Sequence, residues 1–117
     1  LIVKLHPMDT GMIDWARETA VIARRHGVPE RVLFIDGGDL DRLMADAALV
    51  FVINSTVGLH ALRAGRPTKA LGIAVYDMPG LTEQRDLDAI WAAPSAPDPD
   101  LTQALVRLLA AAIQVRG

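Results

Sequence analysis

Residues 51–62 read Phe51-Val52-Ile53-Asn54-Ser55-Thr56-Val57-Gly58-Leu59-His60-Ala61-Leu62. An apolar strand ends at three small polar residues, Asn54, Ser55 and Thr56, and a helix begins immediately after them. Such a turn presents backbone N–H groups and hydroxyls at a helix N-terminus, where the helix dipole favours an anion. The segment therefore predicts a strand–turn–helix unit that binds an anion at its turn.

Two details of this turn support the prediction, although a plainer interpretation stays open. Ser55 or Thr56 is a natural helix N-cap, and Gly58 allows a ligand or a strand to approach the first turn closely. In the plainer interpretation this is an ordinary connection whose hydroxyls only cap the helix. No Walker A loop and no GxGxxG pattern is present, so triphosphate and dinucleotide fingerprints are not met.

The rest of the chain alternates short apolar runs with helical patterns. Strands are expected over residues 1–5, 31–36, 49–53 and 68–71, and helices over residues 13–25, 40–47, 56–64, 86–91 and from Pro99 onwards. Strands alternating with helices indicate an α/β fold with a parallel sheet. We expect a Rossmann-like three-layer α/β/α domain with a parallel sheet of four to five strands.

The last helix is expected to bury one apolar stripe, formed by Leu101, Ala104, Leu105, Leu108 and Ala112. Asp98 is its expected N-cap and Pro99 its first residue. Residues 72–85, which follow the fourth strand, are punctuated by Gly72, Pro79 and Gly80 and are expected to be irregular.

A second candidate group lies at the end of the first strand. Pro7 fixes the chain after His6 and biases that histidine towards an extended backbone, so its imidazole would have a defined direction. There it could donate to a phosphate or protonate a leaving oxygen, but a histidine packed at a sheet edge is the alternative. Lys4 shares the face of His6 and could add charge, or it could simply extend its ammonium into solvent. The carboxyl ends of parallel strands meet at one sheet edge, so His6 is expected near Ser55 and Thr56.

Two further residues are weaker candidates for contacts with the same ligand. His60 lies one turn into the helix that follows the turn and could face either the site or solvent. Thr82 belongs to the irregular segment, whose polar groups could close over a sugar or base. No residues have metal-ligand spacing, and neither an HExxH motif nor a G-x-S-x-G elbow is present, so no metal and no cofactor is expected.

Composition sets the limits of this interpretation. A chain of 117 residues with 51% hydrophobic residues fits one domain, here residues 1–117. The net charge of −2 gives no electrostatic case for nucleic acid, and the absence of cysteine excludes disulfides and fits a reducing compartment. No apolar run reaches the roughly 18 residues of a membrane span, and no signal peptide is recognised. Because Leu1 falls inside an apparent strand, we expect a piece of a longer protein.

An ordered series of short motifs carries a resemblance to a known family. The series is Lys4-Leu5-His6-Pro7, Ile53-Asn54-Ser55-Thr56-Val57-Gly58-Leu59, Gly65-Arg66-Pro67, Leu71-Gly72 with Tyr76-Asp77, Gly80-Leu81-Thr82, and Leu87-Asp88-Ala89-Ile90-Trp91. In order and spacing it resembles the C-terminal part of the bacterial capsule polysaccharide biosynthesis/export family. Within that family the series looks like the KpsS/LipB-type branch, whose members are retaining β-Kdo transferases.

This resemblance implies a ligand and a partner domain. It implies a GT-B architecture of two Rossmann-like halves, in which this half binds the nucleotide sugar, CMP-Kdo. His6 matches the family histidine expected at the donor phosphate, and Ser55 and Thr56 match the phosphate-binding pair. Many GT-B enzymes hold the ribose with a glutamate where this chain has His60, so that contact departs from the pattern.

The resemblance also implies partners outside the chain. An acidic catalytic residue and the N-terminal half are expected elsewhere in the protein, and the acceptor is a lipid at the cytoplasmic face of the inner membrane. The expected location is therefore cytoplasmic and peripheral to that membrane. Two alternatives stay open: a non-catalytic flavodoxin-like regulatory or interaction module, and half of another sugar-nucleotide enzyme such as an epimerase.

Overall fold

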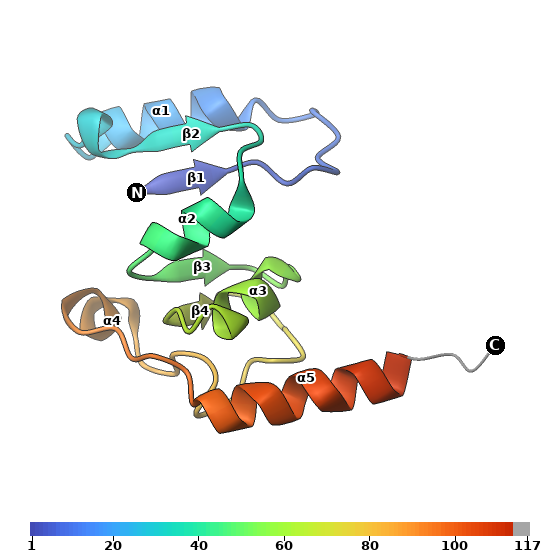
Figure 1. The fold of residues 1–117 in the computed structure, drawn as a ribbon. Coiled ribbons are helices and arrows are strands. Elements are labelled where there is room, and N and C mark those ends of the chain that lie inside the picture. Colours follow the sequence, from blue (N-terminus) through green and yellow to red (C-terminus); the bar gives the residue numbers. More distant parts are fainter. Residues whose placement is uncertain (114–117) are drawn as a thin grey trace. The chain divides into compact units, whose positions relative to one another are not determined.

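The computed structural model describes residues 1–113, which form a mixed α/β structure (Figure 1). The elements follow in the order β1 (Ile2–Lys4), α1 (Trp15–Arg25), the 3₁₀ turn η1 (Pro29–Arg31), β2 (Leu33–Ile35), α2 (Leu40–Asp46), β3 (Val50–Val52), α3 (Val57–Arg63), β4 (Thr68–Ala70), α4 (Leu87–Ala92) and α5 (Pro99–Ile113). The expected alternation of short strands and helices is therefore confirmed.

The strands form two parallel pairs. β1 pairs with β2, with Val3 opposite Phe34, and β3 pairs with β4, with Phe51 opposite Lys69. The chain divides into two compact units, Leu1–Leu40 and the part from Asp41 onwards, so each pair belongs to its own unit. Parallel pairing agrees with the α/β class, whereas one sheet of four to five strands and one domain over the whole chain stay predictions.

In the first unit, α1 packs alongside the β1–β2 pair. The Asp14 side chain caps this helix by accepting a hydrogen bond from the Arg17 amide. The helix ends at Arg25, and Gly27 follows its C-cap with a φ of 69°, which suits a residue without a side chain. The strand expected from Arg31 begins only at Leu33, because residues 29–31 form a 3₁₀ turn.

In the second unit, helices cover both sides of the β3–β4 pair. Val50 and Val52 are buried, and Phe51, which alternates with them, packs its ring against Trp91 of α4 at a centroid distance of 5.2 Å. Helix α3 contacts both strands and buries Ala61 and Leu62. The core of this unit lies around the strand pair, and it fixes where the chain leaves β3.

The buried face of α5 shares only Leu105 with the predicted stripe. Leu101 and Leu108 are 36% and 65% exposed, whereas Thr102 and Leu105 are buried. The threonine hydroxyl donates to the carbonyl of Asp98 at 2.8 Å, so its burial leaves no unsatisfied polar group. Apolar residues lie on most sides of this helix, so helical spacing identified Leu105 correctly but not the rest of the buried face.

Asp98 caps α5 as expected, because its carboxylate accepts hydrogen bonds from the amides of Asp100 and Leu101. Within residues 1–113, neither α5 nor any other helix combines the length and the apolar character that a membrane span requires.

Candidate functional site: the turn after β3

Residues 54–56, called the β3 turn below, connect β3 to α3. The hydroxyl of Ser55 accepts a hydrogen bond from the Val57 amide at 3.2 Å, and its carbonyl accepts one from the Gly58 amide at 3.0 Å. The carbonyl of Thr56 accepts a bond from the Leu59 amide at 3.0 Å. The first amides of α3 are therefore already bonded within the chain, and the expectation that they are free for an anion is wrong.

The polar groups that remain available to a ligand lie in the β3 turn itself. Within residues 1–113, the amides of Ser55 and Thr56 have no hydrogen-bond acceptor. The exposed Thr56 side chain forms no cap hydrogen bond, so Ser55 supplies the cap and the Thr56 hydroxyl is left over. Asn54 is exposed as well. Two amides, a hydroxyl and an amide side chain together can bind an oxygen-rich anion.

The group that lies close to Gly58 is the side chain of Tyr76, whereas the sequence had suggested a ligand or a strand. A Cβ atom at this position would overlap the phenol ring of Tyr76, so glycine is required for the ring to fit. The Tyr76 hydroxyl donates to the carbonyl of Ser55 at 2.5 Å. Tyr76 is buried, and its burial, with a smaller contribution from Asp77, raises the pKa of the phenol, which keeps it a donor. No local signal in the sequence indicates this support.

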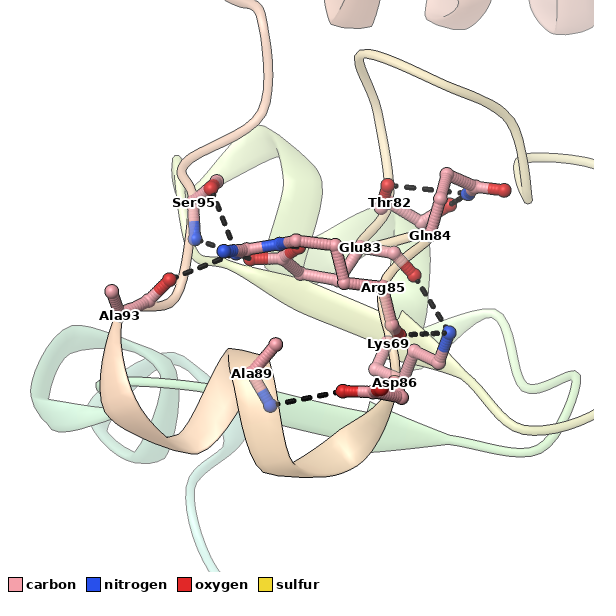
Figure 2. A network of polar contacts seen from close by, with 9 residues as sticks. All are labelled: Lys69, Thr82, Glu83, Gln84, Arg85, Asp86, Ala89, Ala93 and Ser95. Carbon is pink, nitrogen blue, oxygen red and sulfur yellow. Dashed lines mark hydrogen bonds and ion pairs between the residues drawn. The ribbon is translucent and has the colours of Figure 1, made fainter.

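Residues 72–85 follow β4 and are called the β4 segment below. Thr82 of this segment is buried, and its hydroxyl forms hydrogen bonds within the segment. It donates to the Asp77 carboxylate at 2.7 Å and accepts from the Met78 amide at 3.1 Å and from the Gln84 side chain at 2.9 Å. Figure 2 shows Thr82 and Gln84 beside each other in this arrangement. The ligand contact of Thr82 stays a prediction, and in this structure every bonding position of the hydroxyl is used within the segment.

An ion pair ties the end of the β4 segment together (Figure 2). The Arg85 guanidinium donates to both carboxylate oxygens of Glu83, at 3.0 and 2.5 Å, and also to the carbonyl of Ala93. The Ser95 amide donates to the same carboxylate at 2.5 Å. Lys69, on β4, donates to the carbonyls of Glu83 and Arg85, both at 3.0 Å. This cluster anchors the segment to the strand.

The hydrogen bonds of the cluster control its charge state. Glu83 is 5% exposed, and the bonds from Arg85, followed by the bond from the Ser95 amide, hold the pKa of its carboxyl below the usual range, against the opposing effect of burial. The same carboxylate raises the pKa of Arg85. The pair is therefore ionised at neutral pH and serves to order the segment.

His60 lies on α3, is exposed, and lines an open groove between α3 and α5. Thr56 of the β3 turn lines the same groove. The structure thus brings together Thr56 and His60 of the predicted site, and the groove adds Arg63, which the sequence did not suggest.

Lys4 and His6 belong to the first unit. His6 is exposed, and its Nδ1 accepts a hydrogen bond from the Met8 amide at 3.1 Å, so a neutral imidazole carries its proton on Nε2. The Lys4 ammonium is half-buried and donates to the carbonyl of Leu5 at 3.4 Å. The meeting of these residues with the β3 turn stays a prediction, since the turn belongs to the other unit.

Known proteins similar to this chain point to one biological process. A protein of Neisseria meningitidis serogroup A, described as capsule polysaccharide modification protein LipB, is 38% identical over 107 residues, which are 89% of this chain and 25% of that protein. Capsule polysaccharide export protein KpsS of Escherichia coli is 37% identical over 98 residues, which are 84% of this chain and 25% of that protein. The chain thus spans about a quarter of the length of these relatives.

No solved structure is significantly similar to the chain. The family model described as capsule polysaccharide biosynthesis protein matches residues 1–117, which is the whole sequence. The chain therefore belongs to the capsule polysaccharide biosynthesis protein family.

Proposed function

We propose that this chain is the donor-binding part of a capsular polysaccharide glycosyltransferase. The donor is CMP-Kdo, and the β3 turn holds its phosphate. The observation that carries the proposal is the state of this turn: the amides of Ser55 and Thr56 have no acceptor within residues 1–113, and the Thr56 hydroxyl does not cap α3. Unused donors beyond the carboxyl end of a parallel strand are the usual phosphate contacts of α/β proteins.

His6 is the proposed catalytic residue. Its Nδ1 is occupied by the Met8 amide, which leaves Nε2–H as a donor for a phosphate oxygen as the sugar departs. For this step His6 must lie near the β3 turn, as it would if the two strand pairs joined in one Rossmann-like sheet of a GT-B half. Lys4, Asn54 and His60 are proposed as further contacts of the donor.

The remaining parts of the reaction lie outside this chain. We propose an N-terminal half of the same protein, which supplies the acidic catalytic residue, and a lipid acceptor at the cytoplasmic face of the inner membrane. The names of the relatives, a capsule polysaccharide modification protein and a capsule polysaccharide export protein, support a role in capsule biosynthesis. On its own the chain is expected to bind nucleotide weakly and to transfer nothing.

Replacing Thr56 by alanine tests the proposal. The side chain is exposed and forms no cap hydrogen bond, so Thr56→Ala should leave the free energy of unfolding within about 0.5 kcal/mol of the parent. The lost hydroxyl contact should weaken CMP binding about threefold to tenfold, measured by NMR titration. Thr10→Ala, at an exposed threonine of the first unit, is the matched control and should bind like the parent.

If Thr56→Ala and Thr10→Ala bind CMP with the affinity of the parent chain, Thr56 does not contact the nucleotide. If the parent chain itself shows no saturable response to CMP, the β3 turn is not a nucleotide site.

A further inference from the structure

The groove between α3 and α5 combines cationic and apolar side chains. It has a volume of about 180 Å³ and is lined by Thr56, Leu59, His60, Arg63, Val106 and Leu109. Leu59, Val106 and Leu109 form apolar walls, whereas Thr56, His60 and Arg63 are exposed and follow one side of α3 at helical spacing. The groove therefore offers hydrogen-bond donors beside an apolar surface.

The cationic side of this groove is not neutralised by the protein. No carboxylate lines the groove, and no hydrogen bond or ion pair joins the side chains of His60 and Arg63 to any of residues 1–113. An unpaired guanidinium beside an imidazole is complementary to an anion, and its planar fork fits a carboxylate with two parallel hydrogen bonds.

The size of the groove limits what it can hold. Binding pockets for whole small molecules usually measure about 300–1,000 Å³, so a groove of about 180 Å³ accommodates only part of a ligand. The groove starts at Thr56, where the phosphate of the proposed donor lies. The part that it holds should therefore be covalently close to that phosphate.

We propose that Arg63, assisted by His60, binds the carboxylate of the donor sugar and so selects an acidic sugar over a neutral one. This inference rests on the proposed function. Kdo carries its carboxylate on the anomeric carbon, which also bears the phosphate oxygen, so the two anionic groups are neighbours. Phosphate in the β3 turn then brings the carboxylate to the start of the groove, and the sugar ring rests on its apolar walls.

The position of Arg63 along α3 is compatible with this contact. A helix rises about 1.5 Å per residue, so the Cα atom of Arg63 lies roughly 10 Å along the axis from Thr56. Long side chains on a helix generally lean towards its N-terminus, so the guanidinium can extend back along the groove towards the β3 turn. His60 lies between the two, one turn after Thr56, and its imidazole N–H can donate to the same anion.

The test compares two ligands on four versions of the chain. CMP and CMP-Kdo are titrated into the parent chain, Arg63→Gln, Arg63→Lys and the control Arg107→Gln, and binding is followed by backbone amide NMR. Arg107 lies on α5, is exposed and does not line the groove. Amide spectra that keep the parent pattern show that each variant is folded.

We expect the parent chain to bind CMP-Kdo about ten times more tightly than CMP, the factor that one charge-assisted contact provides. Arg63→Gln should remove this preference because it weakens CMP-Kdo binding much more than CMP binding. Arg63→Lys should retain part of the preference, and Arg107→Gln should retain all of it. Equal binding of the two ligands by the parent, or an undiminished preference in Arg63→Gln, would overturn the inference while the proposed function stands. Binding of neither ligand by the parent would overturn both.

Discussion

The β3 turn and the β4 segment both follow a parallel strand of the second unit, yet they differ in how far their polar groups are hydrogen-bonded within the protein. In the turn, the amides of Ser55 and Thr56 have no acceptor within residues 1–113. In the segment, the polar side chains bond to one another: Thr82 to Asp77, and Glu83 to Arg85. Position at a strand end therefore does not distinguish the two regions, whereas the presence or absence of a hydrogen-bond partner within residues 1–113 does.

The second region also supports the first. Tyr76, from the β4 segment, packs its ring on Gly58 and donates to the carbonyl of Ser55. The bonded segment is thus the scaffold that fixes the open turn, much as outer residues orient the ligands of a binding site. Substitutions can therefore disturb the β3 turn and the β4 segment separately.

The largest effect is expected from Gly58→Ala. Alanine normally favours a helix over glycine by about 1 kcal/mol, but the new Cβ would overlap the Tyr76 ring. We expect a loss of about 3 kcal/mol in the free energy of unfolding, measured by urea titration of the Trp91 indole signal.

The control for Gly58→Ala is the double variant with Tyr76→Ala. Without the ring, the added methyl group has room, so Gly58→Ala should then cost almost nothing relative to Tyr76→Ala alone. A full loss of stability in both backgrounds would show that the ring is not the cause.

A somewhat smaller effect is expected from Glu83→Gln. The buried carboxylate accepts bonds from Arg85 and from the Ser95 amide, and a neutral amide cannot replace them all. The loss should be about 2 kcal/mol, with little change at the β3 turn in the amide spectrum. Asp88→Asn, at an exposed carboxylate in the first turn of α4, is the control and should cost only about 0.5 kcal/mol through the helix dipole. Equal stability of the parent and Glu83→Gln would refute a role for the ion pair.

The same pair predicts an acid dependence of stability. Arg85 holds the pKa of Glu83 below the usual value of about 4.3, so the unfolded chain binds this proton at a higher pH than the folded chain. The contribution of the pair is therefore complete above about pH 5 and is lost as the pH falls through the folded pKa. The stability difference between the parent and Glu83→Gln should shrink in acid. A constant difference from neutral pH to about pH 3 would contradict this sign.

The smallest effect on stability is expected from Tyr76→Phe. This change keeps the ring on Gly58 but removes the donor to the Ser55 carbonyl, which should cost about 1 kcal/mol. Tyr76 supports the turn by two contacts, the ring on Gly58 and the hydroxyl bond to Ser55. Because the variant loses the second contact, CMP binding should also weaken by a small factor. Unchanged stability, measured by the same urea titration, would mean that the hydroxyl bond contributes nothing.

The sequence predicted most elements because their signals are local. Asp98 caps α5, and Gly27 follows the C-cap of α1 with a positive φ, as their residue types suggest. Ser55 and Thr56 were found in the same way, because polar residues interrupt an apolar run. Local signals identified Leu105 but not the rest of the buried face of α5, because the apolar residues of this helix occupy more than one stripe and a hydrogen bond to Asp98 allows Thr102 to be buried.

The rest of the site depends on contacts between distant residues. Tyr76 meets Gly58 across 18 positions of sequence, and no spacing rule connects them. The bonds that occupy Thr82 depend on the folded course of the β4 segment, so the sequence could not separate this threonine from the free hydroxyl of Thr56. The position of Arg63 in the groove was not predicted, because it depends on the packing of α3 beside Val106 and Leu109 of α5.

The central claim is that the β3 turn binds the nucleotide and the β4 segment supports it. Amide NMR titration of the chain with CMP tests this claim most directly, because it reports on both regions in one experiment. We predict saturable shifts at the amides of Ser55 and Thr56 and at His6, and none at Thr82 or Gln84. Shifts confined to Thr82 and Gln84, with the amides of the turn unchanged, would contradict the account.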